Sequence, residues 1–159
     1  YNINLTYILK ENMYMKIIQI ISIIFLLNNL VFADNMTMKY GGDWTKQTVV
    51  ANGDFVQMSG AFVGTNVMKL ESGEEIVTND ICTGIFTMGV GGNGACKMKD
   101  ANSEDFWVLT WACDGSSMPT KCTGEAISGT GRFEGVSGKM TWIDKSGFGE
   151  GQGTFNLKK

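Results

Sequence analysis

Four cysteines are the residues of this chain whose chemistry is easiest to define: Cys82, Cys96, Cys113 and Cys122. Their successive spacings are 14, 17 and 9 residues, whereas a four-cysteine zinc site needs close pairs such as C-x2-C. An even number of cysteines in a small exported domain indicates disulfides, and four cysteines allow three pairings. We favour Cys82–Cys96 and Cys113–Cys122, because each pair flanks one hairpin-like loop.

The absence of histidine excludes several kinds of catalytic and metal site. A chain of 159 residues with no histidine has no Ser-His-Asp triad, no histidine-activated cysteine and no histidine-ligated zinc, haem or copper. Carboxylates such as Glu125, Glu134, Asp144 and Glu150 could include an acid–base pair, but no spacing singles one out. The sequence therefore leaves any catalytic residues unknown, and we expect no metal and no cofactor.

Two loop motifs resemble ligand sites but have simpler interpretations. Gly89–Gly94 matches the G-x-G-x-x-G pattern, but a dinucleotide site needs a helix after it, and residues 95–98 have the pattern of a strand. We interpret this segment as a hairpin tip. Asp100–Asp105 places oxygen ligands at alternate positions, but it lacks the glycine and the distant glutamate of a calcium loop. We interpret it as a solvated acidic turn.

The elements that must position these residues are strands. Apolar and polar residues alternate through residues 34–159, and no stretch of ten or more shows a helical period. Trp107, Leu109 and Trp111 share one face of the strand predicted at 106–112, and each cysteine has the parity of its apolar neighbours. Further strands are predicted at residues 36–40, 45–51, 55–63, 67–70, 75–88, 95–99, 139–143 and 151–158.

This pattern predicts an all-β fold: a single antiparallel closed barrel of about eight strands, similar in architecture to a lipocalin. A two-sheet β-sandwich is the alternative. Glycines inside the predicted strands favour the barrel, because a strongly coiled sheet needs kinks and bulges. These glycines are Gly84, Gly124, Gly138, Gly151 and Gly153.

The first 33 residues are interpreted as a targeting segment. Lys16 precedes the apolar run Ile17–Leu27, and Val31-Phe32-Ala33 has the small residues of a cleavage site. We predict a helical signal peptide at residues 13–33, after upstream or fragment residues 1–12 and before a single barrel domain at 34–159. The run is too short for a membrane anchor, which needs about 20 apolar residues. We therefore expect a secreted or periplasmic protein without stable membrane insertion, and its net charge of −3 argues against nucleic-acid binding.

The most distinctive segment is Gly129-Thr130-Gly131-Arg132-Phe133-Glu134-Gly135-Val136-Ser137-Gly138. It resembles the G-T-G-[KR]-[FY]-x-G-[IV]-x-G signature of small secreted bacterial proteins that look like relatives of the allene oxide cyclase and dirigent barrels. With Cys82-Thr83-Gly84 and Gly94-Ala95-Cys96, the resemblance covers roughly Ile81 to Trp142. It implies an eight-stranded antiparallel barrel with a partly apolar interior, and it transfers no catalytic residue.

The glycines of this segment have a physical interpretation of their own. Gly129, Gly131, Gly135 and Gly138 permit a tight connection with positive φ between two strands. Phe133 and Val136 are expected to fix that corner to the core.

Three functions are compatible with such a chain. The first is a non-catalytic barrel that binds a small apolar ligand, with Trp107, Trp111 and Trp142 lining the cavity. The second is an isomerase or cyclase similar to allene oxide cyclase, using carboxylates and bound water. The third is an interaction module without a pocket. A barrel cavity above roughly 300 Å³ would favour the first two functions; the oligomeric state stays unspecified.

Overall fold

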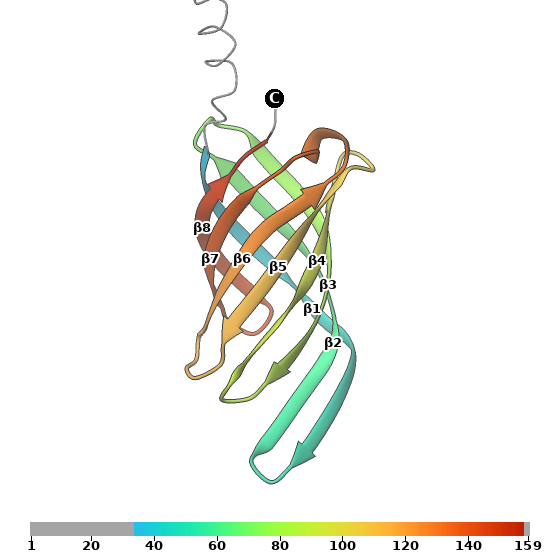
Figure 1. Ribbon diagram of the computed structural model, residues 1–159, viewed down its shortest axis with the longest axis vertical. Helices are drawn as coiled ribbons and strands as arrows, with labels where there is room; N and C mark the ends of the chain where they lie inside the picture. Colours follow the sequence, from blue (N-terminus) through green and yellow to red (C-terminus); the bar gives the residue numbers. More distant parts are fainter. Residues whose placement is uncertain (1–33, 158–159) are drawn as a thin grey trace, which may run out of the picture. The chain divides into compact units, whose positions relative to one another are not determined.

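The computed structural model describes residues 34–157, and these form one closed antiparallel barrel (Figure 1). Each strand pairs with the next along the chain, and β1 also pairs with β8 through residues 34–41. The predicted signal peptide and the segment before it lie outside the described residues. The strands are β1 (Asp34–Asn52), β2 (Phe55–Leu70), β3 (Glu75–Thr87), β4 (Gly91–Asp100), β5 (Phe106–Asp114), β6 (Thr120–Gly129), β7 (Gly138–Asp144) and β8 (Phe148–Phe155).

The barrel confirms the predicted fold class and excludes the sandwich. The first strand, β1, pairs with the last strand, β8, as well as with β2, so the sheet is closed. The single short helix of the described part is the 3₁₀ turn η1 (Gly131–Phe133). Among the described residues, no helix has the length and apolar character required to cross a membrane.

Two pairs of predicted strands are each one longer strand. Residues 36–40 and 45–51 both belong to β1, and residues 55–63 and 67–70 both belong to β2. Gly42 and Gly64 interrupt the sequence pattern there, yet they face each other in the ladder. A Cβ atom would lie 2.7 Å from the Phe62 ring at Gly42 and 2.6 Å from it at Gly64. These glycines make room for an aromatic ring inside a continuous sheet.

The same pairing of large and small residues fills much of the barrel interior. The Trp111 ring lies across two strands, 2.3 Å from the position of a Cβ on Gly84 and 2.6 Å from one on Gly94. Other rings occupy the space over glycines in the same way: Phe86 over Gly92, Tyr40 over Gly149, and Trp142 over Gly124. The glycine-rich composition is thus a packing requirement of a narrow barrel.

We expect Gly94→Ala to destabilise the protein by about 1–3 kcal/mol, because overpacking displaces side chains and backbone. The added Cβ would lie 2.0 Å from the carbonyl oxygen of Thr83 and 2.6 Å from the Trp111 ring. Gly41→Ala is the matched control, since the nearest atom to its Cβ is 3.9 Å away. Denaturant unfolding of both variants tests this; equal stability of the two would contradict the packing argument.

The end of the barrel that carries η1 is closed by buried side chains. Phe133 and Val136 are buried there, and the rings of Trp107 and Phe155 pack edge-to-face at 5.0 Å. Gly131 and Gly135 have φ values of 53° and 72°, a conformation that glycine adopts without strain. Of the four glycines expected at this corner, Gly131 and Gly135 thus have the positive φ, whereas Gly129 does not and Gly138, at 159°, is nearly extended. Phe133 and Val136 belong to the buried core, as expected.

Arg132 holds this closed end to two neighbouring connections. Its guanidinium donates to Asp100 at 2.9 Å and to Glu74, while its backbone N–H donates to Asp105 at 3.1 Å. The solvated acidic turn expected at residues 100–105 is wrong for Asp100, which is only 3% exposed. The sequence pattern could not show that Arg132, 32 residues away, supplies a partner for this carboxylate.

We expect Arg132→Ala to lower the free energy of unfolding by about 2 kcal/mol, because it removes the cation that pairs with buried Asp100. This expected loss is smaller than the loss for a fully buried ion pair, because the Arg132 side chain is 37% exposed. Lys145→Ala is the control, since its contact with Glu150 is exposed and 3.9 Å long. Thermal unfolding of both variants measures the difference, and a loss no larger than that of the control would refute the role of Arg132.

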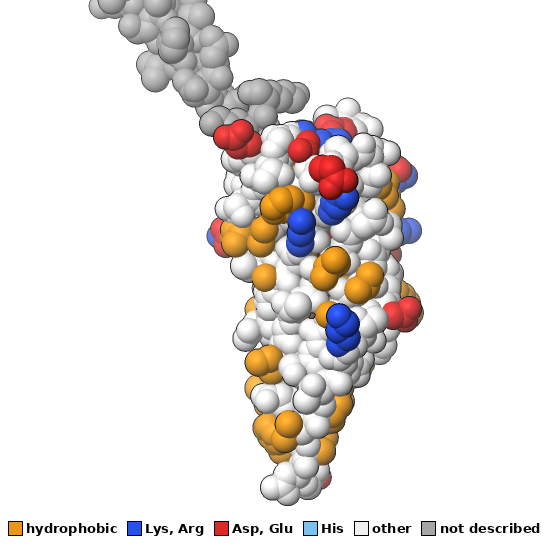
Figure 2. All heavy atoms as spheres, turned by 90° about the vertical axis from the view of Figure 1, so that its right-hand side faces the viewer, with side chains coloured by type: hydrophobic (Ala, Val, Ile, Leu, Met, Phe, Trp, Pro, Cys, Tyr) orange, Lys and Arg blue, Asp and Glu red, His pale blue; other side chains and the backbone are white. Residues whose placement is uncertain are grey.

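The opposite end of the barrel bears a projecting hairpin. Residues 48–52 of β1 pair with residues 55–59 of β2 beyond the point where β8 stops pairing with β1. Figure 2 shows apolar side chains on this projection and charged side chains mainly over the rest of the barrel. Val49, Val50 and Phe55 are each about half exposed.

Candidate functional site

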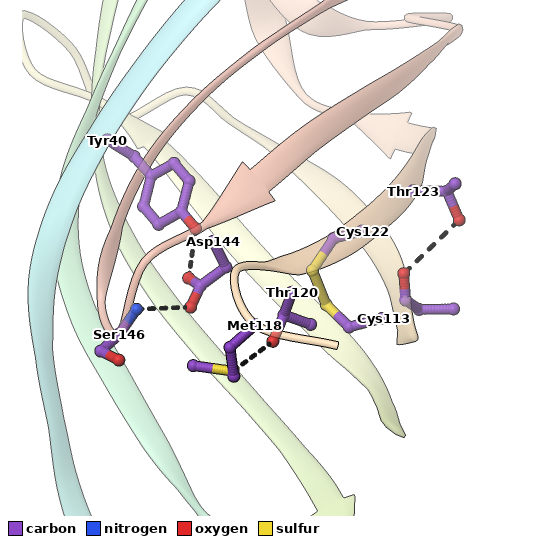
Figure 3. Close-up of a disulfide and its surroundings, with 9 residues drawn as sticks. Tyr40, Cys113, Met118, Thr120, Cys122, Thr123, Asp144 and Ser146 are labelled. Atoms are coloured by element: carbon purple, nitrogen blue, oxygen red, sulfur yellow. Dashed lines mark hydrogen bonds between the residues drawn. A yellow bond between two sulfur atoms is a disulfide. The ribbon is translucent and has the colours of Figure 1, made fainter. Parts of the chain in front are cut away.

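Both disulfides are present in the predicted pairing, Cys82–Cys96 and Cys113–Cys122. The members of each pair face each other directly in the ladder, β3 against β4 and β5 against β6. All four side chains point inward, as their parity predicted, and all four line the interior cavity. The bonds therefore connect strands at the wall of the candidate site, and Figure 3 shows the bond Cys113–Cys122.

The barrel encloses a cavity of about 390 Å³. Its deepest lining includes the buried residues Met38, Met98 and Leu109, and its mouth lies among the β3–β4, β5–β6 and β7–β8 connections, opposite η1. Two larger hollows of about 610 Å³ are open grooves on the outer surface, where exposed side chains such as Gln152 line them. The interior cavity is the candidate site because it combines depth with a mainly apolar wall.

Of the three tryptophans expected at the cavity, two line it. Trp111 reaches it from β5 and Trp142 from β7. Trp107 does not line it: this residue is fully buried at the closed end, against Phe155. The strand pattern gives the face of a residue but not its height in the barrel, so parity alone could not separate Trp107 from Trp111.

A buried polar row forms part of the cavity wall. Asn66 on β2 lies opposite Thr78 on β3, and Asp80 follows on the same inward face. Asn66 is 2% exposed and Asp80 is 4% exposed, and both line the cavity. The Thr78 hydroxyl donates to Asp80 Oδ1 at 2.6 Å, whereas Asn66 Oδ1 has no hydrogen-bond partner among residues 34–157.

Burial raises the pKa of Asp80 from 3.8 to about 7, and the hydrogen bond from Thr78 opposes this only in part. Desolvation disfavours the ionised carboxylate, and no cationic side chain lines the cavity among the described residues. Asp80 is therefore a carboxyl group that changes charge near neutral pH at the wall of an apolar cavity.

A second carboxylate lies nearer the mouth. Asp144 accepts a hydrogen bond from the Tyr40 hydroxyl and another from the backbone N–H of Ser146 at 2.9 Å (Figure 3). Burial first, and then the neighbouring Asp144, raises the pKa of Tyr40 well above its ordinary value. Tyr40 therefore keeps its proton, and its hydroxyl group donates a hydrogen bond to Asp144.

Among the four carboxylates named from the sequence, Asp144 alone lines the cavity; Glu125, Glu134 and Glu150 are exposed. Asp80 and Asn66 were not among the residues expected at a site from the sequence. A signal for Asp80 was present, because it has the same parity as Cys82 in a predicted strand and so must point inward. An inward carboxylate in an apolar face is the anomaly that marks the site.

No family model, curated protein or solved structure matches this chain. No group of three or more acidic or cysteine side chains in residues 34–157 is arranged to hold a metal ion.

Proposed function

We propose that this barrel is an exported protein that binds a small, largely apolar molecule in its interior cavity. The single observation that supports this is the cavity itself: about 390 Å³, open at one end and lined by aromatic, methionine and disulfide side chains. This volume lies in the range of small-molecule sites. A solidly packed barrel or a module without a pocket would lack it.

The two disulfides support export, because such bonds persist in extracellular and periplasmic compartments and are rare in the reducing cytosol. The signal peptide predicted from the sequence agrees with this. A fusion of residues 1–33 to a reporter that is active only after export tests the leader independently of the barrel.

Binding is tested with N-phenyl-1-naphthylamine, a largely apolar dye whose fluorescence rises in apolar surroundings. We expect saturable binding to the wild type and a loss of about tenfold or more in Leu109→Trp, which fills the deep part of the cavity. Val63→Trp is the matched control, since Val63 is half exposed and absent from the cavity lining. No saturable binding to the wild type, or equal loss in both variants, would refute the proposal.

A second candidate function, an isomerase or cyclase, has one observation in its favour. Asp80 is a buried carboxyl group with a pKa of about 7 at a substrate-sized cavity, which suits proton donation and return. The resemblance to allene oxide cyclases suggests a fatty-acid epoxide as the test substrate. Turnover that is lost in Asp80→Asn and kept in Asp43→Asn, an exposed position, would establish it; no turnover by the wild type would exclude it.

A further inference from the structure

The charges around the cavity are all of one sign. Asp80 and Asp144 line it, and among residues 34–157 no lysine or arginine does; the chain has no histidine. Arg132, the single arginine of the sequence, pairs with Asp100 at the closed end of the barrel. An anionic ligand such as a fatty acid would thus enter an apolar site without a counter-charge, at high desolvation cost.

The polar atoms of this wall do not satisfy one another. The Thr78 hydroxyl donates a hydrogen bond to Asp80 Oδ1, whereas Asn66 Oδ1 and the indole N–H of Trp111, one acceptor and one donor, have no partner among residues 34–157. Buried polar groups without partners are costly, and native proteins satisfy nearly all of them. At the Asp80 carboxylate the complementary group is a hydrogen-bond donor, and a charged donor interacts with it most strongly.

Aromatic faces complete the environment. Tyr40, Phe62, Phe86, Trp111 and Trp142 all line the cavity. The negative face of an aromatic ring attracts a cation, most strongly when the cation is removed from water. Such a wall accepts both an organic cation and the apolar body that carries it.

We propose that the cavity selects an organic amine, whose protonated amino group contacts Asp80 while its apolar body lies among the aromatic rings. This inference rests on the proposed ligand-binding function and adds the chemical class of the ligand. The amine supplies the positive charge that no lining residue among the described ones carries, together with N–H groups that donate to the Asp80 carboxylate. Binding then replaces an uncompensated buried carboxylate with a paired one.

Binding of the amine should depend on pH, because Asp80 must be ionised to pair with it. The other titratable groups facing this region are Asp100 on β4, paired with Arg132, and Tyr40 and Asp144, which bond to each other. Asp80, with a pKa of about 7, changes charge between pH 5.5 and pH 8, while an alkylamine stays protonated throughout. We expect amine affinity to fall by about tenfold or more from pH 8 to pH 5.5.

The test compares three probes with one apolar body: 4-phenylbutylamine, 4-phenylbutan-1-ol and 4-phenylbutanoate. At pH 8, calorimetric titration of the wild type should give the amine an affinity at least about tenfold above that of the carboxylate. Asp80→Asn should weaken the amine by about tenfold or more and leave the alcohol within about threefold. Asp43→Asn, at an exposed carboxylate of β1, should change neither.

The outcomes separate this inference from the function on which it rests. Equal affinity for the three probes, or amine binding unaffected by both Asp80→Asn and pH, would overturn the amine assignment and leave ligand binding intact. Failure of the wild type to bind any of the probes or the naphthylamine dye would overturn both. The pH comparison uses the wild type alone, so it decides the matter even if Asp80→Asn folds poorly.

Discussion

Asp80→Asn is expected to make the protein more stable at pH 8 by up to about 4 kcal/mol and to change its stability little at pH 4. The folded state raises the pKa of Asp80 from 3.8 to about 7, and each pH unit of difference corresponds to about 1.4 kcal/mol. Asparagine has nearly the same shape and can still accept the hydrogen bond from Thr78, but it carries no charge to desolvate.

The direction follows from proton binding. Between pH 4 and pH 7 the folded protein holds a proton on Asp80 that the unfolded chain has released, so the wild type loses stability as the pH rises through this window. Below about pH 4 both states are protonated, and this cost disappears. Denaturant unfolding of wild type, Asp80→Asn and Asp43→Asn at pH 4 and pH 8 measures the effect. Destabilisation by Asp80→Asn at pH 8 would show that the carboxylate has a stabilising partner.

Reduction of the disulfides is expected to cost about 3 kcal/mol of unfolding free energy for each bond. The bonds close loops with sequence separations of 14 and 9 residues, and in the chain-entropy account loops of this size restrict the unfolded chain by about that amount. Intact mass should rise by about four mass units on complete reduction, one hydrogen per thiol. Both effects follow from the same four cysteines.

The two bonds can be separated with the variants Cys82→Ala/Cys96→Ala and Cys113→Ala/Cys122→Ala. Alanine suits these positions because all four side chains line an apolar wall, where serine would bury a hydroxyl group. Each double variant should lose about 3 kcal/mol, and a reductant should then weaken it only through the remaining bond. A wild type whose unfolding midpoint is the same with and without reductant would contradict the account.

The buried polar row has opposite consequences for stability and for binding. Asp80 and Asn66 are unfavourable for folding, since one is a desolvated carboxyl group and the other has an oxygen without a partner among the described residues. Native proteins retain such groups at sites where binding or catalysis uses them. A ligand with hydrogen-bond donors would therefore both fill the cavity and stabilise the fold.

The strand pattern of the sequence was sufficient for the all-β class and for the direction of the cysteines, whereas the choice between barrel and sandwich needed the closed pairing of β1 with β8. Side chains alternate across a strand, so parity placed Cys82, Cys96, Cys113 and Cys122 on the inner face, and hairpin spacing gave their pairing. The same alternation implied an inward Asp80. These features are local, and a local period of two encodes them.

The tertiary structure alone decided which inward residues meet. The barrel stagger places Trp111 at the cavity and Trp107 in the closed core, although both have the same parity. It also brings Arg132 to Asp100 and leaves Asn66 beside Asp80 without a donor. Height along a barrel and contacts between distant strands depend on register and closure, which no short stretch of the sequence contains.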